Sequence, residues 1–194
     1  MKIPRQLAMI LLGLTIAAQI ATPAWLVGRL EWLRCNGEEV LVPCQAFDPY
    51  DPLRGRYVTI NPGLDLLPVK EGAVIEQGDE YYLRAAPDDE GVYRFVDASV
   101  VPPEGEPYLT LTARRWTSSD GSVRPQLPFR RYYMNEAMAP EAELVYRDAV
   151  RQMRKNDEKR VELRLRVRNG RGAVDGILID GRPIEEFIKE AGAE

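Results

Sequence analysis

The sequence predicts a mainly β protein of the α+β class, in which an N-terminal transmembrane helix precedes one antiparallel β-rich domain. Three observations lead to this fold class. An apolar run without charges opens the chain, short alternating segments separated by Gly, Pro and Asp follow, and one amphipathic helix is indicated near residues 140–155. We expect the anchor over residues 1–30 and a single domain over 35–194, because no repeat or linker divides the second part.

The first predicted element is the anchor helix. Lys2 and Arg5 precede residues 7–27, which carry no charge, and a helix of that length rises roughly 30 Å, the thickness of the hydrocarbon core. Basic residues before the run favour a single pass in the bacterial inner membrane with the C-terminal domain extracytoplasmic. An uncleaved signal-anchor is favoured over a cleaved signal, because the run is long and Pro23 lies in the cleavage window.

The two cysteines follow the anchor. Cys35 and Cys44 are separated by a segment that contains Asn-Gly, a turn signal. Outside the membrane disulfides persist, so we expect these two residues to form one. Two buried free thiols are the alternative.

The β-rich part begins with short strands bounded by turn residues. Between the anchor and the amphipathic helix, the expected strands are 39–46, 57–60, 80–86, 92–100, 108–115 and 129–134.

The C-terminal part has the clearest periodicity. Ala142, Val145, Ala149 and Met153 recur at helical spacing, which predicts the amphipathic helix over 140–155. Strict alternation then predicts a strand over 161–167, the Asn-Gly step at 169–170 a turn, 173–179 a returning strand, and 183–191 a short helix.

The composition excludes several classes of function. The chain has no histidine, which rules out Ser-His-Asp catalysis, imidazole metal sites and a histidine pH switch. Two cysteines are too few for a thiolate zinc site, and a net charge of −4 gives no electrostatic reason to bind nucleic acid. We predict no cofactor and no metal.

Carboxylates are the remaining candidates for catalysis. Asp48, Asp51, Glu136 and Glu141 are the residues that a cell-envelope hydrolase would use. Their sequence positions do not fix a paired geometry, and acids at the start of a helix stabilise its dipole without any further function. An enzyme is therefore the alternative hypothesis and a non-enzymatic binding module the favoured one.

Arginines make up one face of the strand predicted over 161–167. Arg164, Arg166 and Arg168 share this face and lie after the anchor in a domain held beside a membrane. A basic stripe of this kind attracts anionic lipid headgroups or an acidic partner. Pairing of the arginines with the many acidic residues is the favoured interpretation.

One short segment, DPYDPLRGRYVTI at 48–60, combines acids, bases, prolines and a glycine. It resembles the signature of the GDYXXLXY family of bacterial membrane-anchored proteins of unknown function. The resemblance extends to the RRYYMNE junction. The binding or structural motif that we assign on this basis comprises Asp48, Asp51, Arg54, Gly55, Arg56, Tyr57, Arg130, Arg131 and Tyr132.

The family consensus is kept only in part. Gly55 and Tyr57 are retained, whereas Arg56 replaces an acid, Ile60 a leucine and Pro62 the final tyrosine. The resemblance implies a membrane-anchored accessory module that associates with a polytopic membrane protein or an envelope component, and it supplies no known reaction.

Overall fold

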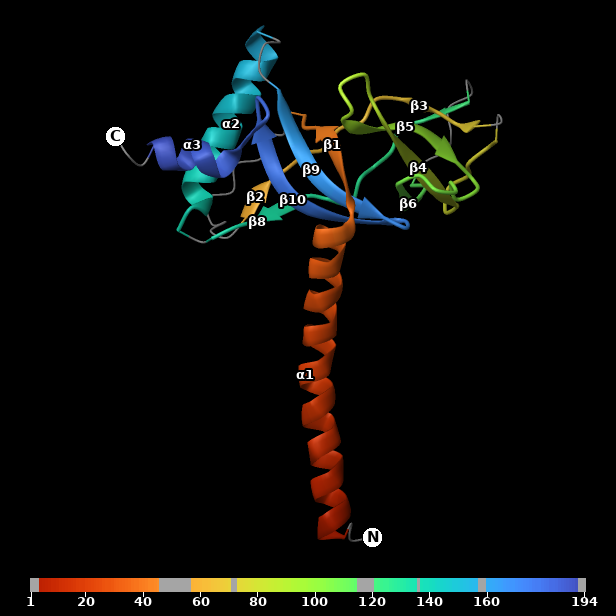
Figure 1. Ribbon diagram of the computed structural model, residues 1–194, viewed down its shortest axis with the longest axis vertical. Helices are drawn as coiled ribbons and strands as arrows, with labels where there is room; N and C mark the ends of the chain where they lie inside the picture. The colour runs from red at the N-terminus through yellow and green to blue at the C-terminus, as the bar shows by residue number, and fades with distance from the viewer. Residues whose placement is uncertain are drawn as a thin grey trace.

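A long helix leads directly into a curved sheet, and two shorter helices lie beside that sheet (Figure 1). The computed structural model describes residues 4–45, 57–70, 73–114, 121–135, 137–156 and 160–191. In chain order the elements are α1 (Arg5–Asn36), β1 (Glu38–Pro43), β2 (Tyr57–Thr59), β3 (Leu67–Pro68), β4 (Glu80–Pro87), β5 (Tyr93–Ser99), β6 (Tyr108–Thr112), β7 (Ser122–Val123), β8 (Arg131–Tyr133), α2 (Ala139–Asn156), β9 (Val161–Arg168), β10 (Arg171–Ile179), β11 (Arg182–Pro183) and α3 (Ile184–Ala191). The predicted class, mainly β with an N-terminal apolar helix, is confirmed.

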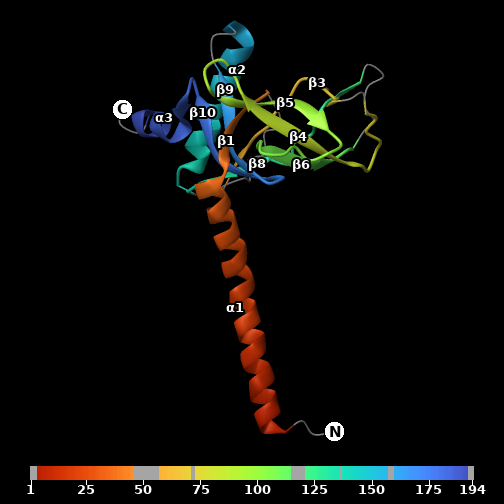
Figure 2. The same ribbon diagram turned by 45° about the vertical axis from the view of Figure 1, so that its right-hand side comes forward.

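Helix α1 stands apart from the rest of the protein as a stalk (Figures 1 and 2). Its apolar stretch is fully exposed and is long and apolar enough to cross a membrane, judged by length and composition. The helix does not stop where the apolar run ends at Val27. It continues to Asn36, so its whole length is roughly 48 Å at 1.5 Å per residue.

The helix passes into β1 through one residue. Gly37 donates its backbone N–H to the carbonyl of Leu33 at 2.8 Å, and Leu33 is buried. A Cβ on Gly37 would lie 2.7 Å from that carbonyl oxygen, so the close approach requires glycine. The expected Asn-Gly turn is therefore the end of a helix, and the domain is attached without a linker.

This junction also accounts for the cysteines. The expected disulfide is wrong, because both residues are free thiols, with Cys35 exposed on α1 and Cys44 buried beyond the end of β1. The extended strand between them spans roughly 20 Å, whereas a disulfide needs Cα atoms within about 7 Å.

The main sheet has seven strands in the order β11-β10-β9-β1-β5-β4-β6. Neighbouring strands are antiparallel except β1 and β5, which pair in parallel where Val40 meets Tyr93. Two short ribbons, β2 with β8 and β3 with β7, accompany it. The sequence patterns did not indicate the two-residue strands β3, β7 and β11.

The last strand of this series, β6, meets the β9–β10 turn. Asn169 and Gly170 both have positive φ, 48° and 78°, as a tight hairpin turn of the primed type needs. Gly170 exchanges backbone hydrogen bonds with β6, accepting from Thr110 at 2.9 Å and donating to Tyr108 at 3.0 Å. The sheet is thereby curled into a partly closed barrel.

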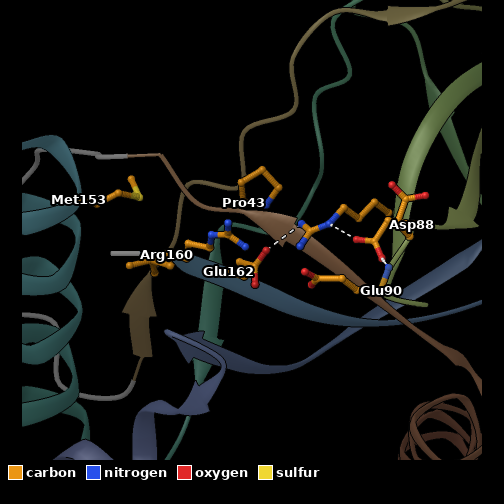
Figure 3. A pocket seen from close by; sticks show the side chains of 9 residues that line it. Pro43, Asp88, Glu90, Met153, Arg160 and Glu162 are labelled. Carbon is orange, nitrogen blue, oxygen red and sulfur yellow. Dashed lines mark hydrogen bonds and ion pairs between the residues drawn. The ribbon is translucent and has the colours of Figure 1, made fainter. Parts of the chain in front are cut away.

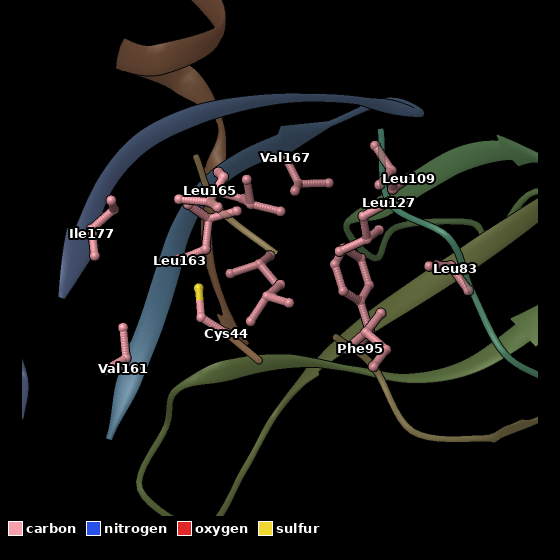
Figure 4. Packing of buried hydrophobic residues seen from close by; sticks show 14 of the residues in the cluster. Cys44, Leu83, Phe95, Leu109, Leu127, Val161, Leu163, Leu165, Val167 and Ile177 are labelled. Atoms are coloured by element: carbon pink, nitrogen blue, oxygen red, sulfur yellow. The ribbon is translucent and has the colours of Figure 1, made fainter. Parts of the chain in front are cut away.

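The curled sheet surrounds one apolar core (Figure 4). Val161, Leu163, Leu165 and Val167 of β9 are all buried, which confirms the predicted alternation. From the opposite wall Leu83, Phe95 and Leu109 point into the same interior (Figure 4). Glu162, which shares the arginine face of β9, is only 8% exposed, and its carboxylate accepts a hydrogen bond from Arg94.

Helices α2 and α3 cover the other part of the core. Ala142 and Ala149 of α2 are buried, and Val145 and Met153 pack against the cluster, as the helical spacing predicts. In α3, Ile184 and Ile188 are buried against the same cluster, with partly buried Phe187 beside them.

We predict that Gly170→Ala destabilises the full chain by about 2–4 kcal/mol, since strain at positive φ adds to overpacking. The new Cβ would lie 2.3 Å from the Thr110 hydroxyl and 3.2 Å from the Tyr108 ring. Gly91→Ala is the matched control, because Gly91 has φ 79° and nothing within 4 Å of its Cβ position. Urea unfolding in detergent measures both variants, and equal losses would contradict a tight closure at Gly170.

Candidate functional site

The signature segment is described in part. Tyr57, Arg130, Arg131, Tyr132 and Glu141 have defined positions. The other predicted site residues lie outside the described residues: Asp48, Asp51, Arg54, Gly55, Arg56 and Glu136.

The ribbon of β2 and β8 brings the two halves of the predicted motif together. Tyr57 pairs with Tyr133 and Thr59 pairs with Arg131 in an antiparallel register. Tyr132 points inward and its hydroxyl donates to Glu185 Oε1 of α3 at 2.7 Å. Burial, and then the hydrogen bond to Glu185, raise the pKa of Tyr132, so this residue fastens the ribbon to α3 as a neutral phenol.

The opposite side of the ribbon carries a cationic and aromatic group, which we call the tyrosine–arginine face: Tyr57, Arg131 and Tyr133. The Arg131 guanidinium lies 4.8 Å from the centroid of the Tyr57 ring, and the rings of Tyr57 and Tyr133 meet edge to face at 5.7 Å. A hydrogen bond with Tyr133 and the neighbouring tyrosines raise the pKa of Arg131. Tyr133 is 65% exposed, which leaves its ring available for contact.

Arg130, the remaining basic residue of the predicted motif, has a structural contact. Its Nη1 donates to Asn61 Oδ1 at 2.9 Å, and its carbonyl accepts from the backbone N–H of Ile60 at 3.1 Å. These two bonds extend the β2–β8 pairing, so Arg130 serves the ribbon rather than its exposed face.

A second group of charges, the anchor cluster, lies where α1 enters the domain: Arg34, Arg164, Arg166 and Asp175. Asp175 Oδ1 accepts from Arg34 Nε at 3.2 Å and its Oδ2 accepts from Arg166 Nε at 3.2 Å. Arg164 Nε is 3.3 Å from Oδ2, an ion pair without hydrogen-bond alignment. One carboxylate therefore joins α1 to both β9 and β10.

A β-bulge positions this carboxylate. Val174 pairs with Leu165 and Gly176 pairs with Arg164, so Asp175 is the extra residue on β10. A bulge re-aims a side chain, and here it turns Asp175 toward the arginine side of β9. Burial alone would raise the pKa of Asp175, but the hydrogen bonds from Arg166 and Arg34 and the charge of Arg164 lower it.

The basic stripe predicted on β9 is thus divided. Arg164 and Arg166 are paired with acids, Asp175 for both and also Glu39 for Arg166 at 3.0 Å. Arg168 has a different environment, because its Nη1 donates to the Asn36 carbonyl at 2.6 Å and its guanidinium lies 5.0 Å from the Trp32 ring centroid.

An open pocket of about 470 Å³ lies at the end of the sheet opposite α1 (Figure 3). In this pocket Arg94 lies between two carboxylates: its Nε is 3.0 Å from Asp88 Oδ2, and its Nη1 is 2.7 Å from Glu162 Oε1. Burial would lower the pKa of Arg94, but both carboxylates accept hydrogen bonds from it and raise that pKa. Asp88 and Glu162 are thus both paired with Arg94, while Asp89 and Glu90 also line the pocket.

Of the four carboxylates predicted for catalysis, only Glu141 lies among the described residues, so the structure shows no carboxylate pair among them. Glu141 lies in the first turn of α2, where an acid favours the helix dipole. Within the described ranges no group of three or more His, Cys, Asp or Glu side chains is arranged to hold a metal ion.

Sequence reasoning missed Asp175 and Tyr133. Nothing in VDGIL marks the bulge, because a bulge depends on the pairing partner. Tyr133 was inside the quoted RRYYMNE segment but was not selected, and only the strand register shows that it shares a face with Tyr57.

Comparison with protein families gives a match. A family model described as GDYXXLXY protein matches residues 19–177. No curated protein and no solved structure matches the chain.

We predict that Asp175→Asn lowers the free energy of unfolding by about 1–2 kcal/mol at neutral pH, because hydrogen bonds to charged groups contribute on that order and Arg34 is half exposed. A folded-state pKa below the usual value near 4 gives stability that is present above that pH and lost as pH falls through the folded pKa. The free energy of unfolding of the variant should therefore depend less on pH below about 4 than that of the native protein.

Urea unfolding in detergent at several pH values measures this effect. Asp148→Asn is the control, because Asp148 is exposed on α2 and has no ion pair in the described part of the chain. An Asp175 variant with the stability and acid sensitivity of the control would show that the cluster does not hold the junction.

Proposed function

The chain belongs to the GDYXXLXY family, and on this basis we propose that it is a membrane-anchored accessory module whose domain binds an integral membrane protein at the bilayer surface. The observation that carries the proposal is the junction of α1 with the sheet. A helix apolar enough to span a membrane continues for about two turns beyond its apolar stretch and ends inside the domain's own packing.

The way that α1 ends supports retention of the helix in the working protein. Leu33 is buried, Arg34 binds Asp175, and the Asn36 carbonyl accepts from Arg168. A removable targeting segment has no need of such contacts with the domain it precedes. The last turns of α1 instead belong to the fold, and they hold the domain close to the end of the apolar stretch.

The two basic residues before the apolar run support an extracytoplasmic domain. Lys2 and Arg5 precede the apolar run, and basic residues are retained on the cytoplasmic side. In a bacterial inner membrane this orientation directs the sheet and both shorter helices to the outer side as a single-pass protein.

The tyrosine–arginine face is the surface that we assign to the partner. Both ribbon views show β8 at the edge of the domain from which α1 emerges (Figures 1 and 2). Tyrosine and arginine are enriched where proteins bind one another, and Tyr57 is a retained residue of the family signature. A polytopic protein in the same membrane would present its loops at this level.

The exposed thiol tests the orientation. We expect a membrane-impermeant maleimide added to intact spheroplasts to label Cys35, while Cys44 stays unlabelled because burial raises its pKa to about 12. Cys35→Ser is the control and should abolish labelling. Labelling only after lysis would place the domain in the cytoplasm and contradict the proposal.

Site-specific photocrosslinking in the native host tests the partner surface. A photoreactive phenylalanine analogue at Tyr133 should give one crosslinked product containing an integral membrane protein. The same analogue at Leu144, which is 51% exposed on α2, is the matched control and should give none. Equal products from both positions, or none from Tyr133, would contradict the assignment of this face.

A further inference from the structure

Two tryptophans and two arginines form a surface where α1 leaves its apolar stretch, and we call it the exit surface: Trp25, Arg29, Trp32 and Arg168. The spacing 25, 29, 32 places the three helix residues on one face of α1. The Arg29 guanidinium lies 5.3 Å from the Trp25 ring centroid, and that of Arg168 lies 5.0 Å from the Trp32 ring centroid. Each cation is thus held over an indole ring that is more than half exposed.

The hairpin of β9 and β10 completes this surface from above. Both views show the hairpin projecting sideways from the top of α1 at the lower edge of the domain (Figures 1 and 2). Arg168 is fixed there by its hydrogen bond to the Asn36 carbonyl at 2.6 Å. One arginine comes from the helix and the other from the domain, so only the folded junction brings them together.

The depth of these residues matches a lipid headgroup layer. Trp25 lies near the end of the apolar run, Arg29 is roughly 6 Å further along the axis and Trp32 roughly 10 Å. The polar layer on each side of the hydrocarbon core is about 5–8 Å thick. When α1 spans the bilayer with its apolar run in the core, Arg29 lies at phosphate level, and Arg168, bonded to the Asn36 carbonyl over the Trp32 ring, lies at the outer boundary of the polar layer.

The charges of the exit surface are uncompensated, unlike those of the anchor cluster. In the ranges that the structure covers, neither Arg29 nor Arg168 has a carboxylate partner, whereas Arg34 is bound to Asp175. Glu31, the nearest acid in sequence to Arg29, is directed to Arg34, with its Oε2 3.9 Å from Arg34 Nη1. Two cations without counter-ions beside an apolar surface call for an anionic, amphipathic ligand.

We propose that the exit surface binds the headgroup of an anionic phospholipid in the outer half of the bilayer. The guanidinium groups donate to phosphate oxygens, and the indole rings pack on the glycerol region, where tryptophan is favoured. A zwitterionic lipid offers the same phosphate but adds an ammonium group that the two arginines repel. This inference rests on the proposed function, because it requires α1 to span the membrane.

Tryptophan quenching by brominated lipids tests the proposal. Trp116→Phe leaves Trp25 and Trp32 as the only tryptophans, and the full chain is reconstituted in nanodiscs of phosphatidylcholine with a quarter phosphatidylglycerol. Bromine is placed near the glycerol end of the acyl chains, either on the phosphatidylglycerol or on the phosphatidylcholine. We expect the brominated anionic lipid to quench more strongly per mole than the brominated zwitterionic lipid. Arg29→Gln should reduce this preference for the anionic lipid about fivefold, the factor typical of one arginine beside anionic lipid.

Two further variants complete the design. Arg168→Gln should reduce the preference by a similar factor, and Arg147→Gln should leave it unchanged, because Arg147 is exposed on α2 away from α1. Equal quenching by both lipids, or a preference that survives Arg29→Gln, would overturn the lipid site and leave the anchor intact. If neither brominated lipid quenches the tryptophan fluorescence, α1 does not insert into the bilayer, and the anchor is overturned as well.

Discussion

The carboxylate of Asp175, held between Arg34, Arg164 and Arg166, is the interaction on which the arrangement of this protein depends. It is the point where α1, β9 and β10 meet. The buried side chain of Leu33 alone would allow the helix to rotate, because apolar contact is not directional. The hydrogen bond from Arg34 to Asp175, a carboxylate that Arg164 and Arg166 of β9 hold in place, fixes that rotation and decides which face of the domain lies next to α1.

Much of the domain could be predicted from local sequence patterns. Period-two alternation identified β9, and helical spacing identified α2, because each element buries one continuous face. The parallel pairing of β1 with β5, the two-residue strands and the bulge at Asp175 were not predictable, since each is defined by the strand it pairs with rather than by its own sequence pattern. The disulfide prediction was wrong for a related reason: a short separation in sequence became the full length of an extended strand.

The candidate site was predictable to a smaller extent. The signature resemblance selected Tyr57, Arg131 and Tyr132, and the ribbon of β2 and β8 brings these three residues together. It gave no information on which side of that ribbon each residue faces. Tyr132 is turned to Glu185, while Tyr133, its neighbour, takes the exposed position beside Tyr57. Side-chain direction alternates along a strand, so it depends on a register that sequence alone leaves open.

The absence of a linker between α1 and β1 has a mechanical consequence. Because Gly37 alone separates the helix from the strand, any tilt of α1 is transmitted undiminished to the domain. Transmembrane helices tilt by about 20° on average as they adjust to bilayer thickness. The pocket at Pro43 lies a strand length above the junction, roughly 20 Å, and such a tilt displaces it sideways by roughly 7 Å. If α1 spans a bilayer as we propose, the domain moves with it as one rigid body, and the bilayer thickness sets the position of the pocket.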